Sequence, residues 1–292
     1  MAWHSGLEHC IRESEPLAAH CWLGLGGPAK FFCEPTNQDE LISLVQRCRE
    51  KSLSIRLIGS GSNILVPDEG FDGLVVSLPA AEFGRITVDG TTVTAGGAAL
   101  LSHTIMTAAR EGLAGMEGLV GIPGTIGGAL HGNAGDRTSD IGSPTESVTV
   151  LTRNGELLTR QRNEMNFSYR QSSLDELAIV ESRFELEPED REELVRRIQK
   201  MWIVKSAVQP TRERRTACLF KDPMGATANE IIEQAGLKGA TENAAALFDR
   251  DANFVIARDA VTSADVRRLI DTIRQQVHEK LGVELETAIQ FW

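Results

Sequence analysis

The chain has 292 residues, of which 41% are hydrophobic, and a formal net charge of −11 at pH 7. This length and composition predict a soluble globular protein with room for two domains and sizeable cores. The excess of acidic residues argues against nucleic acid or an anionic membrane as the main partner, although a local basic patch could still bind a small anion.

The sequence carries no signal for export, for membrane insertion or for a metal. It has no run of eighteen apolar residues, and its start lacks the basic and apolar regions of a signal peptide, so we expect a cytoplasmic protein. The five cysteines are scattered without a C-x-x-C pair, and neither His20 nor His103 has metal-ligand spacing to a cysteine or an acidic residue. We therefore expect reduced thiols and no metal site.

Hydrophobic periodicity predicts a series of helices and strands over the first 160 residues. Helical spacing of apolar residues, β-type alternation and glycine-containing turns distinguish the two kinds of element. The predicted elements are a helix over 39–51, strands over 54–58, 74–78 and 92–100, a helix over 101–110 and a hairpin over 147–160 that turns at Asn154–Gly155.

The composition becomes densely charged around Glu187–Glu193, and we place a domain boundary near this point. A helix is predicted over 188–205, and the basic run at 196–215 suits either a solvated surface or the binding of a diphosphate. The remaining predicted elements are a helix over 228–235, an apolar run over 253–257 and a long helix over 263–281 that Gly282 stops.

Two glycine-rich stretches compete for a phosphate-binding role, GSGSN (59–63) and GIPGTIGG (121–128). Tight turns can point several backbone N–H donors at one anion, and glycine provides the positive φ and the close approach that this requires. Taken singly, each stretch is explained better by an ordinary tight turn between strands. The chain has neither a GxGxxG between a strand and a helix nor a P-loop motif, so a Rossmann or P-loop nucleotide site is disfavoured.

A resemblance to a known family rests on six segments: LGLGGPAKF (23–31), GSGSNILVPDEGFDGLVV (59–76), GMEGLVGIPGTIGGALHGNAG (115–135), FSYRQS (167–172), LFKDP (219–223) and IIEQAGLKG (231–239). In order and spacing they resemble the UDP-N-acetylenolpyruvoylglucosamine reductase (MurB) family. The pair LFKDP and IIEQAGLKG is the most specific part, because wider relatives of the same flavin-binding fold share the glycine-rich segments.

The resemblance implies an α+β fold, namely a two-subdomain FAD-binding fold of the PCMH type followed by a smaller α+β substrate-binding domain. The short gap between FSYRQS and the charged helix is similar to the shorter of the family's two architectural types. The implied bounds are 1–78 and 79–190 for the two FAD-binding subdomains and 191–292 for the C-terminal domain.

The family's reaction implies FAD and NADPH as cofactors. NADPH reduces FAD, and a hydride then reduces UDP-N-acetylglucosamine enolpyruvate to UDP-N-acetylmuramate, a peptidoglycan precursor; we expect a monomer with no nucleic-acid or membrane partner. By the resemblance, the cofactor contacts are Gly59, Gly61, Ser62, Asn63, Pro123, Gly124, Thr125, Gly127, Gly128 and Asn133. A side chain that caps its own turn is the open alternative for the polar residues of this set.

The resemblance also implies the catalytic residues. Arg170 of FSYRQS stands at the family's arginine position, where a planar guanidinium suits the negative charge that develops beside the substrate carboxylate. Cys218 replaces a serine proton donor, and a thiol with a reference pKa of ~8.5 donates a proton more readily near neutrality than an alcohol does. The implied substrate contacts are Tyr169, Lys221, Asp222 (in place of an asparagine) and Glu286. A surface arginine, a buried small cysteine and a solvated lysine are the plain alternatives.

The C-terminal third departs from the family pattern. The ending GVELETAIQFW (282–292) has Ala288 where the resemblance implies a catalytic glutamate, and losing one acid–base group commonly costs ~10²–10⁴ in rate. Either Glu284 or Glu286 could replace it in part. Two other functions therefore stay open: a weakened or repurposed flavoprotein, and another flavin oxidoreductase of the same superfamily. Further departures are Asn243, Ala244, Phe248 and Asp251.

Overall fold

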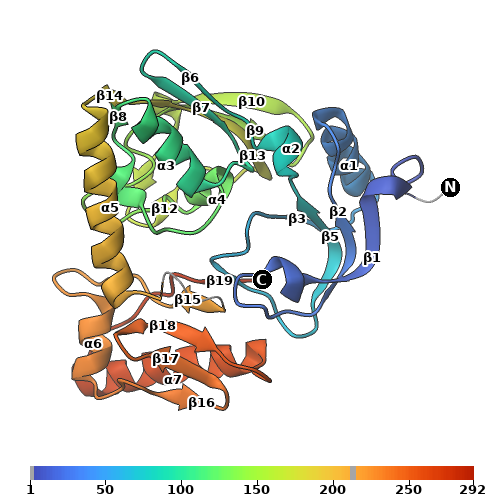
Figure 1. Cartoon of the computed structure of the whole chain (residues 1–292). Helices are drawn as coiled ribbons and strands as arrows, with labels where there is room; N and C mark the ends of the chain where they lie inside the picture. Colours follow the sequence, from blue (N-terminus) through green and yellow to red (C-terminus); the bar gives the residue numbers. More distant parts are fainter. Residues whose placement is uncertain (1–2, 211–214) are drawn as a thin grey trace. The chain divides into compact units, whose positions relative to one another are not determined.

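A computed structural model describes residues 3–210 and 215–292 (Figure 1). Residues 211–214 of the predicted basic run lie outside the described residues. By its internal contacts the chain forms two compact units, the first made of Met1–Glu15, Lys30–Ser60 and Asp72–Val204 and the second of Pro16–Ala29, Gly61–Phe71 and Lys205–Trp292. Two N-terminal segments thus group with the C-terminal region, which the linear bounds 1–78, 79–190 and 191–292 do not express; those bounds stay a prediction.

A four-stranded sheet with one helix forms the first part of the first unit. Its strand order is β1-β2-β5-β3, and β3 runs parallel to β5. The side chain of Asn37 accepts a hydrogen bond from Glu40 N and so begins the helix, whose apolar face packs in one core with β2 and β5. The elements of this part are η1 (Glu8–Cys10), β1 (Ile11–Pro16), β2 (Pro28–Cys33), α1 (Gln38–Glu50), β3 (Ile55–Ile58) and β5 (Phe71–Ser77).

A five-stranded antiparallel sheet forms the second part of the first unit. Its order is β10-β9-β13-β7-β6, and α3 and α4 share its buried core (Figure 1). The predicted hairpin is confirmed, because Leu151 pairs with Leu157 across the turn. The elements are α2 (Ala80–Phe83), β6 (Ile86–Asp89), β7 (Thr92–Gly96), α3 (Leu101–Arg110), β8 (Leu113–Ala114), η3 (Glu117–Leu119), α4 (Ile126–His131), β9 (Thr145–Leu151), β10 (Leu157–Gln161), η4 (Arg162–Glu164), β11 (Phe167–Ser168), β12 (Gln171–Ser172), β13 (Ala178–Glu185) and β14 (Glu187–Pro188).

The charged helix α5 (Arg191–Val208) begins three residues later than predicted. The prediction of a helical start at Pro188 is wrong because Glu187 and Pro188 form β14, which pairs with β8. A second difference is α4, which lies inside the glycine-rich stretch. Its two glycines have low helix propensity, so the sequence did not predict this helix. In the structure Thr125 caps its first turn by accepting a hydrogen bond from Gly128 N.

The second unit is a four-stranded antiparallel sheet with two helices. The strand order is β15-β18-β17-β16, and residues from the segments 16–29 and 61–71 contribute to its core. The predicted helix over 263–281 is confirmed with its apolar face buried, and Gly282 ends it at a left-handed φ of +68°. The elements are η2 (Leu17–His20), β4 (Ile64–Leu65), β15 (Thr216–Cys218), α6 (Ala228–Gln234), β16 (Thr241–Glu242), β17 (Ala245–Phe248), β18 (Asp251–Ala257), α7 (Ser263–Leu281) and β19 (Gln290–Phe291).

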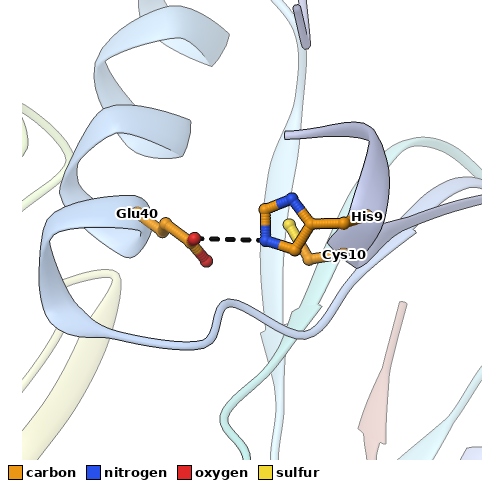
Figure 2. Close-up of side chains that lie close together, drawn as sticks. All are labelled: His9, Cys10 and Glu40. Atoms are coloured by element: carbon orange, nitrogen blue, oxygen red, sulfur yellow. Dashed lines mark hydrogen bonds and ion pairs between the residues drawn. The ribbon is translucent and has the colours of Figure 1, made fainter. Parts of the chain in front are cut away.

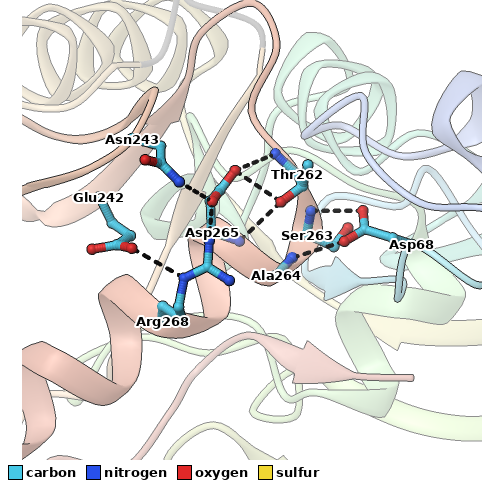
Figure 3. A network of polar contacts seen from close by, with 8 residues as sticks. All are labelled: Asp68, Glu242, Asn243, Thr262, Ser263, Ala264, Asp265 and Arg268. Atoms are coloured by element: carbon cyan, nitrogen blue, oxygen red, sulfur yellow. Dashed lines mark hydrogen bonds and ion pairs between the residues drawn. The ribbon is translucent and has the colours of Figure 1, made fainter.

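A polar network at the start of α7 fixes the segment 61–71 within the second unit (Figure 3). Thr262 and Asp265 form a capping box. The Asp68 carboxylate accepts hydrogen bonds from the next two helix amides, Ser263 N at 2.9 Å and Ala264 N at 3.0 Å. The negative charge at a helix N-terminus adds to this stabilisation. Within the described ranges, none of the helices combines the length and apolar character needed to span a membrane.

Candidate active site

The two glycine-rich stretches meet inside the first unit. A Cβ on Gly59 would lie 2.7 Å from Thr125 Oγ1, and Gly124 adopts a φ of +141° that side chains disfavour. Ser60 Oγ is buried without a hydrogen-bond partner among the described residues, and such a group normally has one. Close backbone approach beside an unsatisfied hydroxyl fits the binding of a phosphate-bearing cofactor.

Part of the glycine content serves backbone packing rather than a ligand. The turn at 121–128 is pinned to the end of β7, because Ile126 N donates to Ala99 O at 2.8 Å and Gly127 N donates to Gly97 O at 2.9 Å. A Cβ on Gly97 would lie only 1.9 Å from Ile179 O. Pro123, Gly124, Thr125, Gly127 and Gly128 thus lie together on one firmly held turn.

Gly61, Ser62 and Asn63 lie in the second unit. Gly61 has a φ of +63° and packs against the turn at 20–22, where Trp22 N donates to Gly61 O. The Asn63 amide donates to Ala288 O at 2.9 Å, which ties the stretch to the segment just before β19. A direct contact between Asn63 and the cofactor therefore stays a prediction, since its side chain also has a structural partner.

We expect Gly61→Ala to lower both FAD occupancy and thermal stability. The new Cβ would lie 2.3 Å from His20 O, and a left-handed φ already costs an ordinary residue ~1–2 kcal/mol. Gly90→Ala is the matched control, because Gly90 has a φ of +59° but nothing within 4 Å of its Cβ position. The flavin-to-protein ratio and a thermal melt measure the effect. Equal losses in the two variants would show that the close packing at Gly61 is unimportant.

Asn133 has a structural role in the first unit. Its side chain is 1% exposed, donates to Asp140 Oδ2 and to Ser168 O, and accepts from Gly142 N. These bonds use both amide donors and one lone pair of the oxygen within the fold, which is what the alternative of a locally bonded side chain expects; a cofactor contact of Asn133 stays a prediction. The bond to Ser168 O holds the short hairpin of β11 and β12 against the glycine-rich segment.

Tyr169 and Arg170 form the turn of that hairpin. Arg170 adopts a left-handed φ of +58°, which is rare for a residue other than glycine. Two guanidinium groups flank the Tyr169 ring, that of Arg137 at 4.2 Å and that of Arg170 at 6.0 Å from the ring centre. The turn is partly exposed and electropositive, which suits an anionic substrate.

Cys218 lies at the end of β15 beside the buried Asn253 of β18. The Asn253 amide donates to Phe220 O at 2.8 Å and contacts Cys218 Sγ at 3.5 Å, while its oxygen accepts from Phe220 N at 2.9 Å. An N–H donor close to sulfur stabilises a thiolate over a thiol. The sequence analysis did not single out Asn253 as a functional residue, although it begins the apolar run predicted over 253–257.

The segment 286–288, just before β19, runs alongside the segment that follows Cys218. Phe220 pairs with Thr287, and Ala288 N donates to Leu219 O at 2.8 Å. Lys221 and Glu286 form an ion pair. The expected substrate contacts Lys221 and Glu286 are thus brought together, and Ala288 lies across from the residue that follows Cys218.

Asp222 serves as a helix acceptor. Its Oδ1 accepts a hydrogen bond from Ala228 N at 2.8 Å at the start of α6. A carboxylate fulfils this role as well as the amide oxygen of asparagine does, so the replacement is compatible with the fold. Burial raises the pKa of Asp251, and the Asp222 carboxylate acts in the same direction, although the backbone N–H of Asn253 opposes both.

Two family models match the chain, one described as "FAD binding domain" over residues 29–160 and one as "UDP-N-acetylenolpyruvoylglucosamine reductase, C-terminal domain" over 209–292. A Rhodopirellula baltica protein named as this reductase is 39% identical over 98% of the chain and 94% of its own length. The chain belongs to the UDP-N-acetylenolpyruvoylglucosamine reductase (MurB) family.

Other MurB proteins agree with this assignment over the whole fold. A Moorella thermoacetica reductase is 35% identical over 99% of the chain and 95% of its own length. The crystal structure of MurB from Thermus caldophilus matches with a TM-score of 0.83 and 32% identity, covering 97% of this chain and 99% of that one. The predicted α+β FAD-binding fold is confirmed, and the chain is an FAD-dependent oxidoreductase of a family that acts in peptidoglycan synthesis.

Proposed function

We propose that the chain is a cytoplasmic reductase that converts UDP-N-acetylglucosamine enolpyruvate into UDP-N-acetylmuramate, with NADPH as the source of the hydride. The observation that carries this proposal is the 39% identity to a reductase of that name over 98% of the chain. Since all the proposed groups come from one chain, we propose that it acts as a monomer.

The flavin, held by residues of the two glycine-rich stretches, supplies the hydride chemistry when bound. The chain's own residues bind the substrate and move a proton. Arg170 binds the carboxylate next to the double bond and stabilises the negative charge that develops there. Lys221, paired with Glu286, holds a further anionic group of the substrate.

Cys218 completes the reduction by donating one proton. A hydride adds to one carbon of the double bond, the thiol proton goes to the other carbon, and the thiolate that remains is stabilised by the Asn253 amide. Either Glu284 or Glu286 partly replaces the acid that is missing at Ala288.

Ala288 is the observation behind a second function, a flavoprotein that binds FAD without efficient turnover. A single anaerobic experiment on the FAD-loaded chain distinguishes the two functions. For the reductase, NADPH bleaches the flavin absorbance, the UDP-sugar substrate restores it, and mass spectrometry detects the reduced sugar. Bleaching without restoration would favour the repurposed flavoprotein. A flavin that NADPH leaves oxidised but another donor reduces would indicate a different flavin oxidoreductase.

A further inference from the structure

Three side chains with metal-binding atoms converge in the first unit (Figure 2), and none of them is among the residues proposed for the reaction. His9, Cys10 and Glu40 each offer one ligand atom, and these atoms all lie within 4.8 Å of one another. His9 Nε2 is 3.1 Å from Glu40 Oε1. The sequence concealed this cluster because Glu40 is about thirty residues away along the chain.

Hydrogen bonds from neighbouring residues orient the Glu40 carboxylate toward His9 and Cys10. Glu40 lies in the first turn of α1, where its backbone N–H is bound by Asn37. Thr36 donates to Glu40 Oε2 through its backbone N–H at 2.8 Å and through its hydroxyl at 2.9 Å. These bonds fix the carboxylate so that Oε1 is the oxygen directed at His9.

A second thiol supports the sulfur of Cys10. The fully buried Cys33 at the end of β2 donates its S–H to Cys10 Sγ at 3.2 Å. The Cys10 thiol in turn donates to Leu7 O, which also accepts from Cys10 N. When a metal ion displaces the Cys10 proton, Leu7 O keeps a donor and the resulting thiolate keeps the hydrogen bond from Cys33.

We propose that His9 Nε2, Cys10 Sγ and Glu40 Oε1 bind one Zn²⁺ ion, with water as the fourth ligand. A nitrogen, a thiolate and a carboxylate are the ligand types of zinc, whereas calcium and magnesium take oxygen ligands. In tetrahedral zinc geometry the sulfur and the nitrogen lie about 3.6 Å apart, which side-chain adjustment can reach from ligand atoms that all lie within 4.8 Å of one another. The half-exposed His9 leaves room for the water.

Binding exchanges one set of bonds for another. The ion takes the place of the hydrogen bond between His9 and Glu40, and the Cys10 thiol releases its proton to solvent. Thr36 and Cys33 remain as outer contacts that orient the carboxylate and the sulfur. The ion would fasten η1 to the first turn of α1, which gives it a structural role in the first unit.

The test uses the full chain with its flavin, stripped of metal by a chelator and kept reduced with a phosphine. Calorimetric titration with Zn²⁺ should give one ion per chain. We expect His9→Ala, Cys10→Ser and Glu40→Gln each to weaken binding by at least ~100-fold, and Cys33→Ala to weaken it by ~10–100-fold. His103→Ala and Glu50→Gln are exposed controls in the same unit and should leave zinc binding unchanged.

Cobalt(II) provides a second readout, because a cobalt–thiolate bond absorbs in the near ultraviolet. This absorption should appear in the parent chain and disappear in Cys10→Ser. If Cys10→Ser does not fold, the half-exposed His9→Ala decides the question, since its side chain lies outside the core. No zinc uptake by the reduced parent chain would overturn the proposal. Uptake that survives both His9→Ala and Glu40→Gln would overturn it equally.

Discussion

Replacing Cys218 by alanine is expected to leave flavin reduction by NADPH intact and to slow substrate-dependent reoxidation by ~10²–10⁴-fold. Reduction of the double bond needs a proton at the second carbon, and alanine has none to give. The backbone around the site should be retained, because Leu219 N and Phe220 N are held by Asn253 and not by the thiol. The variant should therefore be slower only in the half-reaction in which the substrate reoxidises the flavin.

Anaerobic stopped-flow absorbance separates the two half-reactions. Cys218→Ser keeps a weaker proton donor and should give an intermediate rate of reoxidation. Cys21→Ala is the matched control in the same unit, because burial raises the pKa of Cys21 to about 12 and we assign it no chemical role. Reoxidation at the parent rate in Cys218→Ala would exclude this thiol as the proton donor.

The local sequence pattern correctly predicted those helices for which the apolar periodicity and the end signals indicate the same bounds. The helices α3 and α7 occupy the predicted residues, because helical periodicity and a following glycine indicate the same bounds, and in α7 a capping box at Thr262 agrees with them. The helix α4 was hidden, since glycine has low helix propensity and tertiary hydrogen bonds, such as those to Gly97 O and Ala99 O, hold its start in place.

Some residues of the candidate site can be predicted from local sequence, whereas others are identified only by their tertiary contacts. Cys218 and Arg170 are proposed from segments that resemble a family, whereas the roles of Asn253 and Asn133 depend on hydrogen bonds to residues distant in sequence. The same holds for Glu40 beside His9, because ligand spacing along a chain detects only neighbours within one motif. Residues that come together only in the folded chain produce no recognisable spacing in the sequence.

Arg170→Gly is expected to lower turnover by ~10²–10³-fold without lowering the free energy of unfolding. Arg170 is held at a φ of +58°, a conformation that costs an ordinary residue ~1–2 kcal/mol and costs glycine little. Glycine also increases the conformational entropy of the unfolded chain, which lowers the free energy of unfolding by ~0.4–1 kcal/mol. The two effects therefore nearly cancel or leave a small gain in stability. The variant should thus lose function and keep its stability.

Two further variants separate strain from chemistry. Arg170→Ala removes the same guanidinium but keeps a side chain in the left-handed conformation, so it should match Arg170→Gly in activity and be less stable by ~1 kcal/mol. Ser52→Gly changes another left-handed residue of the first unit, at φ +51°, and should alter stability alone. Steady-state turnover and urea unfolding measure the two quantities.

The comparison decides why an arginine occupies a strained turn. If Arg170→Gly keeps its activity, the guanidinium does not bind the substrate carboxylate. If it unfolds more easily than Arg170→Ala, the backbone at this turn does not favour glycine. Lost activity together with retained stability would mean that the fold tolerates strain at Arg170 because the side chain must reach the substrate from this turn, as strained residues at functional sites do.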